Sequence, residues 1–284
     1  MLVGGQVIDA VAQAGPRRVP LAGLLEPWQQ TFLLVGLPGL LIAALFLVVR
    51  EPLRHGVRGG GQRAGALAFM WQRRTTFVPL TLGFSIFGIA GVCYLAWMPA
   101  VLFRLHGWSP AQVGQAYGLI LLAGAVPGVL AGGWICDRIT ARGRSDSPLL
   151  TTAIALAGCL PFAVATPLIA DTGWLLASLA GFSLFGGLLN SMPATALQLI
   201  LSNELRAQVT AIYFLVGNLI SLALGPTIVA LLSDHVLGGP RHIGCALAIV
   251  AGVSVGLAAL LLVRALPAYR ASAAEARVWQ GYAA

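Results

Sequence analysis

A carboxylate and several guanidinium groups follow a long uncharged segment, and groups of this kind form charge-assisted hydrogen bonds. Asp137 is followed at short range by arginines that include Arg138 and Arg142. No Asp, Glu, Arg or Lys occurs between residues 105 and 136. At 1.5 Å per helical residue, such a segment can cross a hydrocarbon core about 30 Å thick. The pattern predicts a membrane-spanning helix whose arginine-rich end faces the cytoplasm.

Three glycines inside that segment recur every four residues, at Gly124, Gly128 and Gly132. This spacing places them on one face of a helix, which another backbone can approach closely. We interpret the face first as a site of helix packing. The second interpretation is that it lets two helices slide or rock against each other.

Uncharged polar residues form helical stripes in two other segments. The first stripe, which also contains small residues, consists of Ser183, Gly187, Asn190, Ala194 and Gln198. The second consists of Asn218, Ser221 and Gly225. A polar stripe in lipid is costly unless it faces protein or water. The stripes therefore predict either hydrogen bonds between helices or the lining of a solute cavity.

Residues for covalent or metal chemistry are not grouped in the sequence. The run Gly181-Phe182-Ser183-Leu184 superficially resembles a nucleophile motif of membrane serine proteases. All four histidines fall in loops or at span ends, which leaves Ser183 without an evident base within the membrane. There is no H-E-x-x-H pair, and the four cysteines show no C-x-x-C spacing. We expect no catalytic residues, no metal and no cofactor, and an intramembrane enzyme is the weaker alternative.

The composition is that of an integral membrane protein with an all-α fold. Hydrophobic residues make up 58% of the chain and charged residues 9%, and the mean hydropathy is +0.87. Seven uncharged runs can each span a bilayer: Trp28–Val49, Thr76–Val101, Gln112–Cys136, Ser147–Ala170, Gly173–Ser202, Ala207–Ser233 and Ile243–Val263. None has an ionisable residue at its middle, so the chain offers no buried proton carrier.

All seventeen basic residues are arginines, and their positions predict the orientation of the chain. If residues 50–74 face the cytoplasm, the loops on that side carry thirteen arginines and the opposite loops carry four. This asymmetry predicts a cytoplasmic C-terminus. Met1 would then lie outside or within a severed span, so we expect at least one further span upstream. Exposed aromatics interleaved with basic patches are absent, which argues against nucleic-acid binding.

The last six spans divide into two sets of three, covering residues 76–170 and 173–263. Because three is odd, the second set starts from the opposite side of the membrane. Inverted three-span repeats of this kind build each half of many secondary transporters.

The run Gly133-Trp134-Ile135-Cys136-Asp137-Arg138 resembles the cytoplasmic loop signature of the major facilitator superfamily. The resemblance implies that Asp137 is a gate carboxylate, with Gly133 at the start of the motif and Arg138 and Arg142 as its basic companions. In that family such groups contact neighbouring helix ends and hold the cytoplasmic gate in one state. This chain departs from the pattern at Thr140, where a glycine is usual.

Two further segments resemble bacterial Spinster-like members of that superfamily. Residues 28–52, which end in Arg-Glu-Pro, resemble their sixth span, and residues 206–234, with an Asn and a Gly-Pro, resemble their eleventh. On this mapping the chain has a remnant of an upstream span and outer loop (1–27), the sixth span (28–49), the central cytoplasmic loop (50–75), the C-terminal six-helix half (76–263) and a cytoplasmic tail (264–284).

The resemblance implies secondary active transport of a small organic or amphiphilic solute by alternating access, in a bacterial inner membrane. It favours a cavity lined by Ser183, Asn190, Gln198, Asn218 and Ser221. Tyr94 and Trp97 either join this lining near its outer end or anchor the helix at the membrane interface. The missing N-terminal half is the expected partner and would hold any coupling carboxylate. As an alternative, the chain alone is a non-functional half that needs a complementary chain.

Overall fold

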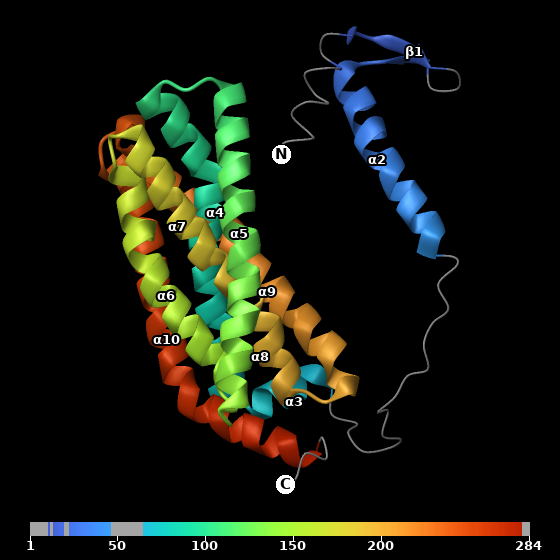
Figure 1. The fold of residues 1–284 in the computed structure, drawn as a ribbon, viewed down its shortest axis with the longest axis vertical. Coiled ribbons are helices and arrows are strands. Elements are labelled where there is room, and N and C mark those ends of the chain that lie inside the picture. The colour runs from blue at the N-terminus through green and yellow to red at the C-terminus, as the bar shows by residue number, and fades with distance from the viewer. Residues whose placement is uncertain (1–10, 12–13, 20–22, 47–64, 280–284) are drawn as a thin grey trace. The chain divides into compact units, whose positions relative to one another are not determined.

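The computed structural model describes residues 11, 14–19, 23–46 and 65–279. The chain forms two compact units, residues 1–56 with 109–119, and residues 57–108 with 120–284. Seven helices in the described part are long and apolar enough to cross a membrane, and they coincide with the seven predicted runs. The prediction of an all-α polytopic protein is therefore confirmed (Figure 1).

The first unit contains a small β-hairpin and one exposed helix. Strands β1 (Arg17–Val19) and β2 (Gly23–Leu25) pair antiparallel, and α2 (Pro27–Phe46) follows. The Gln30 side-chain amide donates hydrogen bonds of 2.9 Å to the carbonyls of Gly15 and Leu25, which join the hairpin to α2. The hairpin lies where a loop was expected, and the predicted remnant of an upstream span falls largely outside the described residues.

The second unit begins with α3 (Ala66–Gln72) and α4 (Arg74–His106), so part of the predicted central loop is helical. Helix α5 (Pro110–Ala141) belongs to this unit from Ile120 onward. The remaining elements are α6 (Ser147–Ala165), η1 (Thr166–Leu168), α7 (Thr172–Asn190), α8 (Met192–Ile200), α9 (Asn203–Leu231), a π-helical turn η2 (Leu232–Val236), η3 (Pro240–His242) and α10 (Ile243–Trp279).

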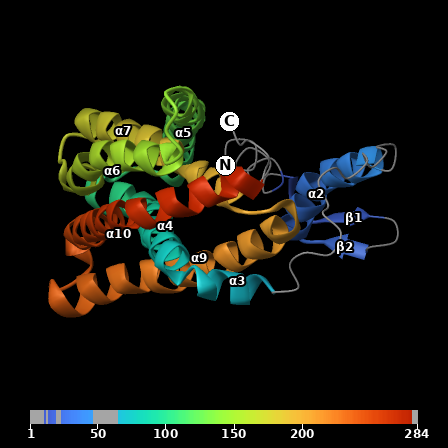
Figure 2. The same ribbon diagram turned by 90° about the horizontal axis from the view of Figure 1, so that it is seen from below.

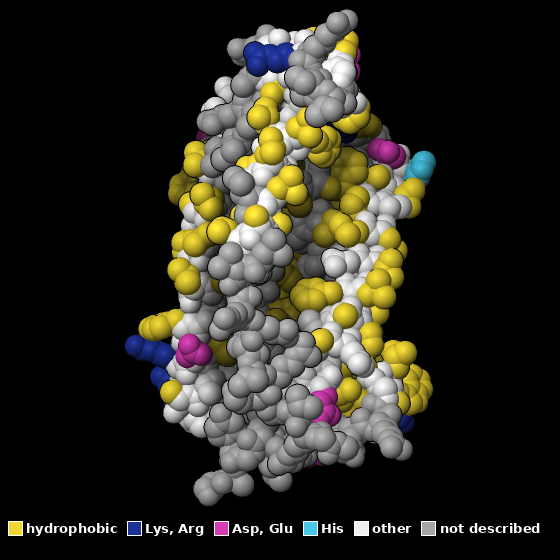
Figure 3. Space-filling view, turned by 90° about the vertical axis from the view of Figure 1, so that its right-hand side faces the viewer, with side chains coloured by type: hydrophobic (Ala, Val, Ile, Leu, Met, Phe, Trp, Pro, Cys, Tyr) yellow, Lys and Arg dark blue, Asp and Glu magenta, His cyan; other side chains and the backbone are white. Residues whose placement is uncertain are grey.

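The core of the second unit lies where α4 and α6 pack against α10, with α9 on α4 and α7 on α6 (Figure 2). Helices α6 and α7 interlock through aromatic rings placed over glycines. Phe162 of α6 covers Gly181, and Phe185 of α7 covers Gly158, with the two rings stacked at 5.8 Å between centroids. The exposed faces of the helices carry many large hydrophobic side chains, and hydrophobic side chains are drawn in yellow in Figure 3.

Two helix boundaries differ from the predictions. The span predicted as residues 173–202 breaks at Ser191, because Pro193 has no N–H and its ring would clash with the Leu189 carbonyl in a continuous helix. The last span was predicted to end at Val263, but α10 continues to Trp279 and bends near Pro267 (Figure 1). The first sixteen residues of the predicted tail are thus helical, and their side chains contact the bundle as described below.

Candidate functional site

The three glycines of α5 lie against the backbone of α7. A Cβ added to Gly124 would lie 2.6 Å from the Ser183 Cβ, and one added to Gly132 would lie 2.8 Å from the Leu188 carbonyl oxygen. A Cβ at Gly128 would overlap the Leu184 carbonyl. We call this α5–α7 contact the glycine seam. The structure therefore uses these glycines for close helix packing.

The first polar stripe is divided between this seam and the surface. Ser183 is buried in the seam, and its hydroxyl has no hydrogen-bond partner among the described residues. Asn190 and Gln198 are exposed and stand on separate helices, because the break at Ser191 lies between them. The stripe is therefore not one continuous face, and the structure does not bring its three polar residues together.

The second stripe is divided in a similar way. Ser221 is buried and donates a hydrogen bond of 2.8 Å to the Ser85 carbonyl, which ties α9 to α4. Asn218, three residues earlier, is exposed. Trp97 also joins these helices, because its indole N–H donates to the Pro226 carbonyl at 3.1 Å. The buried polar contacts of this stripe therefore hold α4 and α9 together.

Tyr94 is 1% exposed and packs into the interior of the second unit. Its ring stacks on Phe182 with 3.7 Å between centroids. Its hydroxyl donates to the Ala163 carbonyl at 2.8 Å. Pro167 cannot donate to that carbonyl as the fourth residue on would in a regular helix, so Tyr94 satisfies a backbone acceptor that α6 leaves unpaired.

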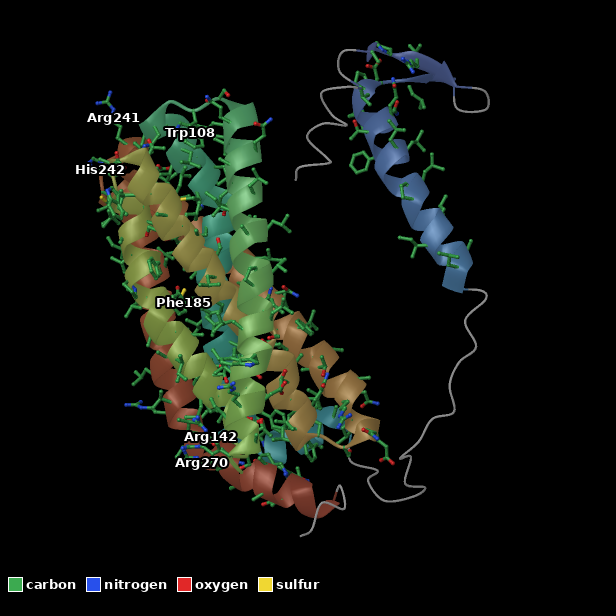
Figure 4. The ribbon with its side chains drawn as sticks, viewed as in Figure 1. Trp108, Arg142, Phe185, Arg241, His242 and Arg270 are labelled. Carbon is green, nitrogen blue, oxygen red and sulfur yellow. The ribbon has the colours of Figure 1, made fainter. Side chains whose placement is uncertain are left out.

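The loop motif lies at the end of α5 that also approaches α6 (Figure 4). Asp137 is exposed and makes no ion pair with any described residue. The Arg138 guanidinium lies 4.1 Å from the centre of the Trp134 ring, and Arg142 is exposed. Gly133, which starts the motif, has nothing within 4 Å of an added Cβ. The motif's charged groups are thus accessible in this structure.

Thr140, the departure from the family pattern, ties the end of α5 to the start of α6. Its hydroxyl donates to the Cys136 carbonyl at 2.9 Å and lies 2.6 Å from the Ser147 hydroxyl. A glycine here would lack both contacts. The substitution therefore adds a side-chain link between these two helices.

Sequence reasoning missed the most connected ionisable group of the described chain, Asp146. This carboxylate is 3% exposed and accepts two hydrogen bonds of 3.1 Å from Arg144 and one of 2.6 Å from Arg270. The hydrogen bonds from Arg144, and secondarily the charge and hydrogen bond of Arg270, lower the pKa of Asp146 below its usual value. Its place just before a Ser-Pro helix start was the available signal, but nothing in the sequence pointed to Arg270.

Other contacts join the C-terminal part of α10 to the same end of the bundle. The Tyr269 hydroxyl donates to the Ala196 carbonyl at 2.9 Å, and the Ser272 hydroxyl lies 2.9 Å from that of Thr76. Glu275 pairs with Arg73 at 2.8 Å. We call Tyr269, Arg270, Ser272 and Glu275, with their partners, the clasp. The clasp fastens α10 to α4, α8 and the loop between α5 and α6.

These features define a multi-pass membrane protein. Most of the polar side chains described above join one helix to another, and they do not form a cluster of reactive groups. Residues 10–226 match the sequence profile of the Major Facilitator Superfamily, and the chain belongs to that family. The resemblance recognised in the sequence is thereby confirmed.

The chain is also similar to a curated protein and to solved structures. It is 28% identical over 253 residues to a protein described as an MFS-type efflux pump from Mycolicibacterium smegmatis. This match covers 87% of the chain and 56% of the relative, so the chain spans little more than half of that protein's length.

Two crystal structures of a bacterial homologue of the human lysosomal transporter Spinster, both in inward-facing conformations, share the fold. The unoccupied form has a TM-score of 0.53 at 23% identity, covering 95% of this chain and 64% of that protein. The occupied form has a TM-score of 0.51 at 21% identity, covering 97% and 63%. The predicted Spinster-like fold is confirmed, and the relatives are described as an efflux pump and as a homologue of a transporter.

Proposed function

We propose that this chain supplies the sixth span and the C-terminal half of a secondary active transporter, which moves a small organic or amphiphilic solute by alternating access. Family membership supports transport. The bacterial relatives support a bacterial inner membrane, and the positive-inside count supports a cytoplasmic C-terminus. The chain spans 56% to 64% of its relatives' lengths, which supports a second half as partner.

The observation that carries the gate assignment is the accessibility of Asp137. This carboxylate lies at the arginine-rich end of α5 and has no ion-pair partner among the described residues. In a closed cytoplasmic gate, a neighbouring helix end would supply a partner with a positive partial charge. The solved fold relatives are described as inward-facing, and in such a state we expect a cytoplasmic gate carboxylate to be accessible. The Asp137 carboxylate would thus contact the neighbouring helix end in one state of the transport cycle and be exposed to solvent in the other.

Asn at position 137 should weaken this contact, because it removes the charge while keeping a similar shape. We expect Asp137→Asn to slow uptake or efflux of fluorescent amphiphilic dyes in membrane vesicles about tenfold, corresponding to about 1.4 kcal/mol. The matched control is Asp234→Asn, an exposed aspartate near the opposite end of the bundle. Equal transport by both variants at equal membrane levels would contradict the gate role.

The assay requires the complete native product. An immunoblot of native membranes through a C-terminal tag, with N-terminal sequencing, identifies that product. A band near twice the 29.5 kDa of this chain directs the assay to a longer chain. A band at 29.5 kDa directs it to a complex of this chain with a partner half.

A further inference from the structure

An apolar groove runs between α6 and the first half of α10. It has a volume of about 400 Å³ and is lined only by apolar residues: Val164, Leu168, Cys245, Ala248, Ile249, Gly252 and Val253. Five of these side chains are exposed, among them Val164 at 38% and Val253 at 63%. The groove therefore opens on the outside of the second unit, where a membrane protein meets lipid.

In the spanning arrangement that the sequence predicts, the groove would lie within one leaflet of the bilayer. Trp174, which is 74% exposed, lies at the start of α7 next to this end of the bundle and suits the membrane interface. The α10 part of the groove runs eight residues from Cys245 to Val253, or about 12 Å along the helix. This length is less than half of a hydrocarbon core about 30 Å thick. A groove of this depth follows the path of one lipid chain inward from the interface.

Two basic residues stand at the interface end of the groove. Arg241 and His242 are exposed, and neither forms an ion pair with a described residue. Arg241 lies in η3, directly before α10, and precedes the lining residue Cys245 by four positions, so it stands close to the start of the groove along the chain. Figure 4 shows both residues at the end of the bundle opposite Arg142. The Asp171 carboxylate accepts the Trp174 backbone N–H at 2.9 Å, which caps the start of α7.

A second transmembrane helix fits this groove poorly. The spacing of Gly252 and Gly256 would suit close helix approach. However, the Val164 side chain lies 2.7 Å from the position of a Cβ on Gly252, so α6 already covers that glycine. A narrow, flexible acyl chain fits the remaining space, whereas a helix backbone would be held away by Val164.

We propose that this groove binds one acyl chain of an anionic phospholipid, whose phosphate lies at Arg241 and His242. The apolar lining selects the chain, and the basic pair selects the negative headgroup over a zwitterionic one. The site lies outside the predicted solute cavity, so it is a site for a resident lipid rather than for transported solute.

Native mass spectrometry of the purified native transporter tests the site with phosphatidylglycerol and phosphatidylethanolamine of identical acyl chains. We expect one phosphatidylglycerol molecule to stay bound at detergent conditions that strip the other lipids. Arg241→Gln should weaken its binding about fivefold, as expected for one basic residue at a membrane surface. Arg142→Gln, which removes the same charge at the opposite end, is the matched control and should leave it unchanged.

A second variant tests the groove itself. Val253→Trp places a bulky side chain in the groove from an exposed position and should abolish retention of the lipid. Val263→Trp, on the same helix at an exposed position outside the groove, should not. The proposal would be overturned if both lipid classes were retained equally, or if Val253→Trp still retained the lipid. It would also be overturned if the protein formed a dimer with no lipid bound, because a second copy would then cover the groove.

Discussion

The glycine seam and the clasp hold helices together by opposite means. In the seam, α5 and α7 meet backbone to backbone, and Gly128 leaves no room for even one added carbon. In the clasp, long polar side chains such as Arg270 and Tyr269 reach from α10 to other elements. A steric contact of the first kind cannot open without moving a backbone, whereas polar contacts can break and re-form by side-chain rotation. We therefore expect α5 and α7 to stay together at the seam, and we expect the clasp to be the contact that rearranges.

Breaking the seam should have the largest effect. In Gly128→Leu the added side chain must displace α7, because its Cβ would overlap the Leu184 carbonyl and lie 3.0 Å from the Gly187 Cα. We expect a loss of stability of more than about 3 kcal/mol, at the upper end of overpacking effects. The measurement is the temperature at which half of the protein remains monodisperse in size-exclusion chromatography.

Gly133→Leu is the matched control for the seam. It adds the same side chain to the same helix, at a glycine with nothing within 4 Å of the new Cβ. Its stability should change by no more than about 0.5 kcal/mol. Similar losses in the two variants would show that the seam is not the steric contact described here.

Breaking the clasp at its centre should have an intermediate effect. Asp146→Asn removes the buried charge that holds Arg144 and Arg270, and both arginines remain about half exposed to solvent. We expect a loss of about 2 kcal/mol, because hydrogen bonds to charged groups contribute more than neutral ones but solvent screens the arginines. Asp137→Asn is the control: it should keep normal thermal stability although we expect it to slow transport.

The effect of Asp146→Asn should also depend on pH. The pKa of Asp146 is lowered in the folded protein, so its carboxylate stabilises the fold above the ordinary pKa of about 3.9. That contribution is lost as the pH falls through the lower folded pKa. The gap in stability between wild type and Asp146→Asn should therefore be full at pH 5 to 7 and shrink below pH 3.9. A gap that grows on acidification would contradict the ion-pair account.

The outer ion pair of the clasp should matter least. Glu275 is 58% exposed, and its partner Arg73 also lies over the Phe69 ring at 4.9 Å. Glu275→Gln should therefore cost about 0.5 kcal/mol, within the range of surface ion pairs. The same thermal assay, repeated at high salt, should show the difference vanish. Glu204→Gln, at an exposed glutamate of α9, is the control. A loss of stability in Glu275→Gln as large as that in Asp146→Asn would contradict the expectation that the outer ion pair contributes least.

Some features of the fold could be predicted from the local sequence, and others could not. The break at Ser191 could not be predicted from Pro193 alone, because Pro127, Pro161 and Pro226 lie inside helices that continue through them. The extension of α10 past Val263 was not anticipated, since charged residues end an uncharged run without ending a helix. The seam glycines and the stripe residues could be named from their spacing, and the candidate gate residues from the family resemblance, but neither signal says which of them are buried.

The sequence alone determined the seven spans and the family. In lipid every backbone polar group must be satisfied within its own helix, so hydropathy and length are enough to locate the spans. Only the tertiary structure decided which side chains form hydrogen bonds and ion pairs with one another. Asp146 and Arg270 are 124 residues apart, and Tyr94 finds the Ala163 carbonyl across 69 residues. Such pairings depend on which helices become neighbours and how they are rotated, and that is set by packing the whole bundle rather than by any local pattern.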